Sequence, residues 1–200
     1  MAKLYFRYGA MNCGKSTAII QVAYNYEEKG RRIWLMKPSI DTKGNTKVLN
    51  RSGLEREVDM LVTPDCNILE NVPLFITEKI DAILVDEAQF LKREQVDELY
   101  EITKLHEIPV ICYGLRCDFQ MKGFPGSTRL LEIADDIEEL KNICDCGKKA
   151  TQNLRLTNGV PTFEGDQVAI DGKDKITYDS KCGKCYLELR NAMARKRMLK

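Results

Sequence analysis

The sequence predicts an α/β protein with a mostly parallel sheet flanked by helices, followed by a small cysteine-rich lobe. As far as about residue 140, short runs of β-forming residues alternate with segments of helical spacing, which is the pattern of βαβ units. Beyond it, cysteine pairs flank a Gly- and Asp-rich stretch without helical periodicity. We therefore expect a core over residues 1–140, a lobe over 141–188 and a basic tail over 189–200.

The core is predicted to begin with a strand, a loop and a helix. Leu4–Tyr8 alternates and is rich in β-formers, and residues 16–29 have helical apolar spacing. Gly30 stands where a helix C-terminus favours a left-handed glycine. Residues 33–36 are then predicted as a second buried strand, which Pro38 closes.

A polar segment interrupts this alternation before it resumes. Residues 39–58 lack a sustained apolar period, so we expect a mobile surface flap there. Ala82–Val85 and residues 109–113 are short continuous apolar runs of the kind found in buried parallel strands, and Arg93–Leu105 between them has helical spacing. Ligands of such sheets bind beyond the carboxyl ends of the strands.

Composition limits the possible functions. The chain has 200 residues, 44% hydrophobic and 30% charged, and its net charge of +1 gives no general attraction to nucleic acid or an anionic membrane. No run approaches the roughly 18 apolar residues of a membrane helix, and the first residues lack the apolar core of a signal peptide. We expect a cytoplasmic protein that uses neither nucleic acid nor membrane as a partner.

The first motif is a phosphate-binding loop. The segment after the first strand fits G-x-x-x-x-G-K-[ST], in which backbone N–H groups at a helix N-terminus cradle phosphates. Lys15 would reach the β- and γ-phosphates, and Ser16 would bind Mg²⁺. This predicts a P-loop NTPase-type core; an ordinary strand-to-helix turn is the alternative. The predicted ATP-binding residues are Gly9, Ala10, Met11, Asn12, Cys13, Gly14, Lys15, Ser16, Thr17 and Asp86.

The second motif is an acidic pair at the end of the buried strand Ala82–Val85. In P-loop enzymes an aspartate at this place helps to hold Mg²⁺, and the next carboxylate can act on the nucleophile. We assign Asp86 to the metal, together with Ser16, and Glu87 to the catalytic base. Taken alone, such a pair is more often the solvated start of a loop.

The third motif is a set of two thiol pairs, Cys144 with Cys146 and Cys182 with Cys185. Their spacing suits two tight turns that close a structural zinc site with four cysteine ligands, and buried free thiols or a redox pair are the alternative. The segment 147–181 would then be a lid pinned at both ends. The remaining cysteines, which we interpret as structural, are Cys13, Cys66, Cys112 and Cys117.

Together these motifs resemble the zinc-containing (type II) thymidine kinases, in their bacterial branch. The resemblance runs from about Leu4 to Tyr186 and rests on GAMNCGKST, KPSIDTK, DEAQF, YGLRCDFQMKGFPGS, the cysteine pairs and the YDSKC that ends at Cys182. It implies transfer of the γ-phosphate of ATP to the 5′-hydroxyl of thymidine, which gives dTMP for nucleotide salvage and DNA synthesis, and also to that of deoxyuridine. It also implies a homotetramer that dTTP inhibits.

The resemblance assigns further residues. Glu87 matches the catalytic base, and Tyr178 matches a tyrosine of the loop that wraps the nucleoside. Asp41 matches a flap aspartate near the phosphates, and the apolar residues among those assigned could equally be core. The implied substrate-binding residues are Met11, Asp41, Phe90, Leu115, Phe119, Phe124, Tyr178 and, through backbone groups that recognise the thymine edge, Val168, Ala169, Ile170, Asp171 and Gly172.

Two other classes stay open. A P-loop ATPase with a zinc ribbon and a basic tail would bind nucleic acid and use Glu87 to position water, although the stripes of basic and aromatic residues typical of a strand-binding groove are missing. A non-catalytic zinc-binding interaction module would make the phosphate loop a relic. His106, the only histidine, is interpreted as an ordinary surface or packing residue.

Overall fold

The computed structural model describes residues 1–41, 46–51, 53–167 and 175–198 and divides the chain into two units. Unit 1 consists of Met1–Tyr8, Gly14–Arg116 and Phe124–Glu139. Unit 2 consists of Gly9–Cys13, Cys117–Gly123 and Leu140–Lys200. Each unit is therefore assembled from segments that lie apart in the sequence.

Unit 1 is built on a sheet of six strands in the order β5-β2-β6-β7-β1-β8, in which each pair of neighbours runs parallel. This confirms the predicted α/β class. The strands are β1 (Leu4–Tyr8), β2 (Ile33–Pro38), β5 (Met60–Val62), β6 (Ala82–Val85), β7 (Val110–Gly114) and β8 (Asp136–Glu139).

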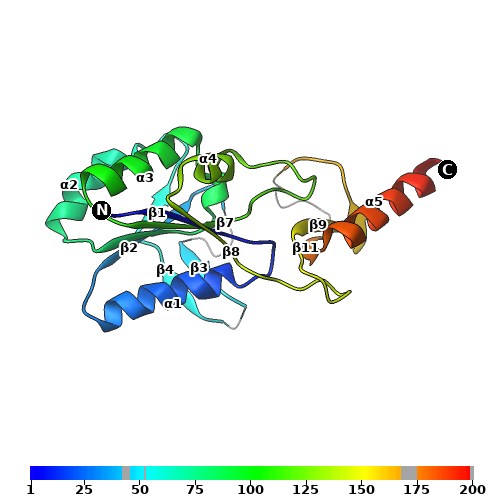
Figure 1. Ribbon diagram of the computed structural model, residues 1–200, viewed down its shortest axis with the longest axis horizontal. Coiled ribbons are helices and arrows are strands. Elements are labelled where there is room, and N and C mark those ends of the chain that lie inside the picture. The colour runs from blue at the N-terminus through cyan, green and yellow to red at the C-terminus, as the bar shows by residue number, and fades with distance from the viewer. Residues whose placement is uncertain (42–45, 52, 168–174, 199–200) are drawn as a thin grey trace. The chain divides into compact units, whose positions relative to one another are not determined.

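Helices cover both faces of this sheet. The helix α1 (Lys15–Glu28) lies on one face, and α2 (Val72–Thr77), α3 (Arg93–Leu105) and α4 (Pro125–Ile133) lie on the other (Figure 1). Right-handed crossovers require this split, because the chain leaves β1 toward one edge of the sheet and returns from β5 through β6 and β7 toward the other. Two short 3₁₀ turns, η1 (Ile68–Asn71) and η2 (Ala88–Phe90), precede α2 and α3.

The predicted flap contains regular structure in its described part. Strands β3 (Lys47–Leu49) and β4 (Glu55–Glu57) pair antiparallel, and Lys47 forms ion pairs with Glu55 and Glu57. Val48, the central residue of β3, has a buried side chain. The absence of an apolar period therefore did not exclude strands in this segment, because a three-residue strand needs only one buried side chain.

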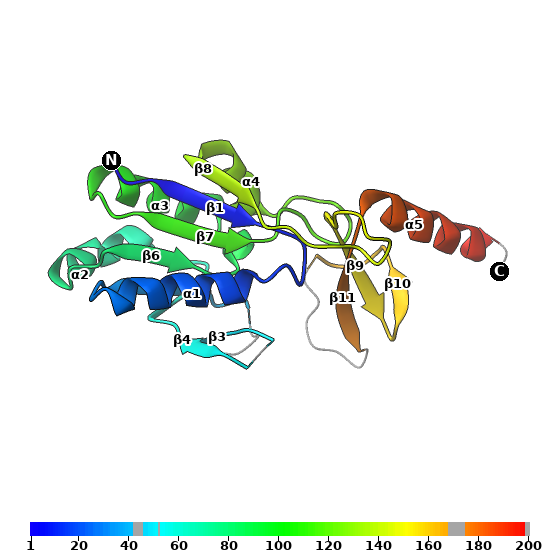
Figure 2. The ribbon, with the colours of Figure 1, turned by 60° about the horizontal axis from the view of Figure 1, so that its bottom comes forward.

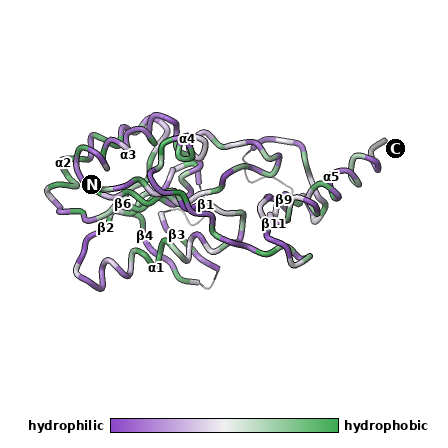
Figure 3. Tube along the Cα trace, viewed as in Figure 1, coloured by the Kyte–Doolittle hydropathy of each residue, from purple (hydrophilic) through white to green (hydrophobic). Residues whose placement is uncertain are grey.

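The core of unit 1 lies on the two faces of the sheet. Strands β6 and β7 are buried along their whole length, as predicted for parallel strands covered on both sides. Hydrophobic residues gather along these central strands, whereas the helices alternate between hydrophobic and hydrophilic positions (Figure 3). The largest buried apolar side chains of this core include Phe6, Met36, Ile68, Phe75 and Ile83.

Unit 2 has a different construction. Strand β9 (Gln152–Thr157) pairs antiparallel with β10 (Val160–Thr162) and β11 (Ile176–Lys181), and α5 (Gly183–Met198) follows (Figure 2). The predicted basic tail is therefore helical as far as Met198. Among the described residues, no helix is both long enough and apolar enough to cross a membrane.

Candidate active site

The phosphate-loop motif connects β1 to α1. Asn12 and Gly14 have left-handed backbones, with φ of 67° and 88°, and α1 begins at Lys15. The N-cap residue of this helix, Gly14, has no side chain that could cap it, so the N–H groups of the first helical turn can bind an anion. A side chain at Gly9 would collide with the Cys13 thiol and lie 2.9 Å from the Leu140 carbonyl oxygen, which fixes glycine at the first motif position.

Asp86 follows β6 directly and is buried, with 4% of its surface exposed. Burial, and next the Glu87 carboxylate, raise the pKa of Asp86 to about 7, while Lys15 acts in the opposite direction. Its Oδ1 atom is buried and has no hydrogen-bond partner among the described residues. A buried carboxylate oxygen left without a donor fits a cation ligand, so this environment suits the predicted Mg²⁺.

Glu87 adopts a left-handed backbone, with φ 49° and ψ 37°, at the start of η2. Such a conformation is uncommon outside glycine and occurs often at functional sites. The Glu87 carboxylate accepts a short hydrogen bond from Nε2 of Gln89, which is fully buried. The strand end thus turns this carboxylate out of β6 and holds it with a neighbouring amide.

Gln89 also joins this carboxylate to the end of β7. Its Oε1 atom accepts a hydrogen bond from the backbone N–H of Leu115 at 3.0 Å, and Oγ of Ser127 donates to the Leu115 carbonyl oxygen at 2.5 Å. Space is short here, because a Cβ at Gly114 would lie 2.9 Å from Oε1 of Gln89. Gln89 was not among the predicted site residues, although it lies within the DEAQF motif.

Other residues predicted to bind substrate in unit 1 occupy its strand ends and loops. The rings of Phe90 and Phe124 meet edge to face, with centroids 5.5 Å apart, and Phe124 is buried. Asp41 forms a 2.9 Å ion pair with Lys37, a lysine that is only 1% exposed. Asp41 also raises the pKa of Asp86, so three carboxylates and Lys15 share one electrostatic environment. Sequence reasoning missed Lys37.

Unit 2 holds the remaining predicted acceptor residues. The backbone N–H of Met11 donates to Oδ1 of Asn153 at 2.7 Å, and its carbonyl oxygen accepts from Nδ2 of Asn142 at 3.0 Å. Nδ2 of Asn153 donates to the Cys117 carbonyl oxygen at 2.7 Å. The first half of the phosphate motif is therefore fastened to β9 and to the loop that carries Phe119.

Phe119 and Tyr178 come together around one arginine. The guanidinium carbon of Arg155 lies 3.6 Å from the centre of the Phe119 ring, and its Nε atom donates to Oη of Tyr178 at 3.1 Å. No motif in the sequence pointed to Arg155. The residues predicted to recognise the thymine edge, Val168, Ala169, Ile170, Asp171 and Gly172, lie outside the described residues.

The four predicted cysteine ligands form one cluster in unit 2. Their Sγ atoms all lie within 4.8 Å of one another, and those of Cys146 and Cys182 are 3.6 Å apart. A tetrahedral metal with metal–sulfur distances of about 2.3 Å separates its sulfurs by about 3.8 Å. Backbone N–H groups of Cys146 and Cys182 lower the pKa of the Cys144 thiol to about 7, which favours the thiolate. The cluster can hold a metal ion.

The other cysteines are not part of this cluster. Cys112 is fully buried in β7, and burial raises the pKa of its thiol. Cys117 is buried as well, while Cys13 and Cys66 are partly exposed. They are not among the four cysteines that could hold a metal ion together, and their interpretation as structural residues stays a prediction.

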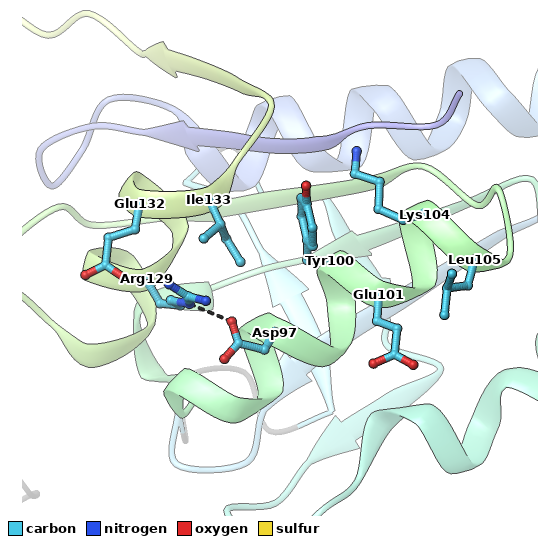
Figure 4. Close-up of a pocket in the computed structure, with 8 residues that line it drawn as sticks. All are labelled: Asp97, Tyr100, Glu101, Lys104, Leu105, Arg129, Glu132 and Ile133. Atoms are coloured by element: carbon cyan, nitrogen blue, oxygen red, sulfur yellow. Dashed lines mark hydrogen bonds and ion pairs between the residues drawn. The ribbon is translucent and has the colours of Figure 1, made fainter.

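A hollow of about 660 Å³ lies between α3 and α4 of unit 1 (Figure 4). Most of its charged side chains are paired: Arg129 pairs with Asp97 at 2.5 Å and with Glu132 at 2.8 Å, and Lys104 pairs with Asp135, which lies outside the lining. Unlike Asp86, none of its lining residues has a buried side-chain nitrogen or oxygen without a hydrogen-bond partner. Its lining is Asp97, Tyr100, Glu101, Lys104, Leu105, Arg129, Glu132 and Ile133.

Known proteins resemble this chain over most of its length. A family model described as thymidine kinase matches residues 2–186. The thymidine kinase of Shewanella oneidensis is 46% identical over 191 residues, which cover 94% of this chain and 98% of that protein. That of Legionella pneumophila strain Paris is 47% identical over 177 residues, covering 87% and 85%. That of Enterobacteria phage T4 is 45% identical over 192 residues, covering 94% and 97%.

Proposed function

This chain belongs to the thymidine kinase family, and from that premise we propose that it transfers the γ-phosphate of ATP to the 5′-hydroxyl of thymidine, and of deoxyuridine. The observation that carries the proposal is the hydrogen-bonded series from Glu87 through Gln89 to Leu115. It links the carboxylate that we propose as the proton acceptor with a residue expected to enclose the nucleobase. The product, dTMP, would enter nucleotide salvage.

The ATP phosphates would bind along the motif from Gly9 to Thr17. Backbone N–H groups at the start of α1 and the Lys15 ammonium would hold the β- and γ-phosphates. Ser16 and Asp86 would hold Mg²⁺, which neutralises charge on the phosphate oxygens when bound. The raised pKa of Asp86 supports this assignment, since a cation would stabilise the ionised form that burial disfavours.

Glu87 would act as general base. Its carboxylate accepts the proton of the 5′-hydroxyl while the hydroxyl oxygen attacks the γ-phosphorus and the bond to ADP breaks. The amide of Gln89 occupies one lone-pair direction of this carboxylate and thereby limits its orientation. Positioning of this kind supplies much of the rate in phosphoryl transfer.

Zinc is the metal that we propose for the cysteine cluster. The thiolates of Cys144, Cys146, Cys182 and Cys185 would supply all of its ligands, so the ion would stabilise the fold of unit 2 rather than take part in the transfer. Acceptor binding would fall to Met11, Asp41, Phe90, Leu115, Phe119, Phe124, Tyr178 and the backbone of residues 168–172. We further propose a homotetramer, inhibition by dTTP, and the cytoplasm as its location, where thiols stay reduced for metal binding.

One assay separates the candidate functions. The purified protein is mixed with Mg²⁺, ATP labelled at the γ-phosphate, and each DNA nucleoside or deoxyuridine in turn. We expect label on the monophosphates of thymidine and deoxyuridine alone. Label released only as inorganic phosphate, with stimulation by single-stranded DNA, would instead establish an ATPase. The Glu87→Gln variant serves as the blank for contaminating kinases.

A further inference from the structure

Arg155 is a charged residue in the interior of unit 2. It lies in the middle of β9 and is 4% exposed. No carboxylate among the described residues forms an ion pair with it. Burying an unpaired charge costs several kcal/mol unless other groups compensate, so the groups that surround this guanidinium must stabilise it.

Four contacts surround the guanidinium. One face lies over the Phe119 ring, with 3.6 Å from the guanidinium carbon to the ring centre, and the Tyr178 ring centre is 5.5 Å away. Nε donates to Oη of Tyr178 at 3.1 Å, and Nη2 donates to the carbonyl oxygen of Gln167 at 3.2 Å. Aromatic faces and neutral oxygens thus compensate the charge through cation–π contacts and hydrogen bonds.

These contacts converge on one part of the proposed function. Phe119 and Tyr178 are residues that we expect to enclose the acceptor, and Gln167 directly precedes the segment expected to recognise its base. We infer that Arg155 is the positioning residue of the acceptor site, which fixes the ring of Phe119, the hydroxyl of Tyr178 and the carbonyl of Gln167 relative to one another. This inference rests on the proposed function.

The surrounding polypeptide is held without Arg155. Oη of Tyr186 donates to the Phe119 carbonyl oxygen at 2.5 Å, and Oδ1 of Asp118 accepts from the backbone N–H groups of Gln120 and Lys122. Nε2 of Gln167 donates to Oδ2 of Asp118 at 3.1 Å. Loss of the guanidinium should therefore loosen the segments that carry Gln167 and Tyr178, while residues 118–122 and the cysteine cluster stay in place.

Two substitutions and one control test this inference. Arg155→Met keeps the apolar stem and removes charge and donors, whereas Arg155→Lys keeps the charge but cannot donate to Tyr178 and Gln167 while lying flat on Phe119. Arg195→Met removes an exposed arginine from α5 of the same unit. For each protein, KM for thymidine, KM for ATP, kcat and metal content are measured.

We expect Arg155→Met to raise KM for thymidine about tenfold and Arg155→Lys about threefold, with KM for ATP within twofold and metal content unchanged. Adding Tyr178→Phe to Arg155→Met should raise KM for thymidine little further, because both changes break the same hydrogen bond, that between Arg155 and Tyr178. An unchanged KM for thymidine, an equal rise in both KM values, or loss of metal would overturn the inference.

Hydrogen exchange separates this inference from the proposed function. In Arg155→Met the segments 163–167 and 176–181 should exchange faster, with β1, β6 and β7 unchanged. If the wild-type protein fails to phosphorylate thymidine but these segments exchange faster in Arg155→Met than in the wild type, only the proposed function is refuted. If the wild type is active and the segments exchange as before, the positioning role is refuted.

Discussion

Unit 1 and unit 2 are stabilised by different interactions. In unit 1 a parallel sheet buries continuous apolar strands between two layers of helices, and buried polar residues such as Lys37, Asp86 and Gln89 lie at or near the ends of its strands. In unit 2 the buried residues include Asp118, Asn153, Arg155 and Lys181, which are held by hydrogen bonds and ion pairs, beside a cysteine cluster. Apolar burial tolerates small displacements, whereas such polar networks fail when one partner is lost. The fold of unit 2 should therefore depend more strongly than that of unit 1 on each single interaction.

Metal removal should produce the largest difference between the two units in hydrogen exchange. Structural zinc in small domains contributes about 10–16 kcal/mol to the free energy of folding. Chelation should therefore let the backbone amides of unit 2 exchange rapidly with solvent, while those of β6 and β7 stay protected. Phosphate transfer should fall more than about 1000-fold, and Cys182→Ser should act likewise. Cys66→Ser removes a thiol outside the cluster and should change neither property. Hydrogen exchange that rises equally in both units would contradict the comparison.

Glu87→Gln should have the next largest effect, and within unit 1 alone. Because only the proton acceptor is lost, kcat should fall about 100-fold or more while KM for ATP changes little. Glu94→Gln removes an exposed carboxylate from the first turn of α3 and is the matched control. Steady-state kinetics decide the matter, and near-normal turnover of Glu87→Gln would exclude this residue as the base.

Gln89→Met tests whether polar contacts in unit 1 matter as much as those in unit 2. We expect kcat to fall about tenfold while KM for ATP stays within about twofold, because the Glu87 carboxylate loses the N–H donor that orients it. Ser127→Ala removes the other side-chain bond to Leu115 and should leave kcat within about twofold of the wild type. An equal fall of kcat in both variants would argue for a purely structural effect.

The smallest effect concerns stability and pH. The pKa of Asp86 is raised to about 7 in the folded state, so between pH 6 and pH 8 the folded protein binds more protons than the unfolded chain. The free energy of unfolding without divalent cations should thus fall by about 1 kcal/mol over this range. Asp86→Asn should flatten that change. Urea titrations at pH 6 and pH 8 measure this change, and an equal change in the free energy of unfolding in both proteins would disprove the prediction.

The sequence predicted unit 1 better than unit 2. Ala82–Val85 and Arg93–Leu105 were predicted with the bounds that β6 and α3 have, because periodicity reports burial against a sheet. Strand β8 was missed because it is polar and exposed at the sheet edge, and α2 because six residues are too few for a helical period. Local patterns therefore suffice where each element buries one apolar face.

The candidate site shows the same contrast. Glu87 and the cysteines could be predicted because each lies in a short motif whose members are close together in sequence. Gln89 meets the backbone of Leu115 26 positions further along, and Arg155 meets Tyr178 23 positions further along. Nothing local marks such partners, since a buried polar residue has the same sequence signature as an exposed one.

Unit 2 is assembled from three separated stretches of the chain, which has a consequence for synthesis and recombination. Met11 leaves the ribosome early, but Asn142 and Asn153, which hold its peptide groups, follow only after most of unit 1 has been made. A gene fragment that ends near residue 140 thus encodes a phosphate loop without these anchors. Chimaeras between relatives should accordingly keep the first thirteen codons and the last third of the gene from the same parent.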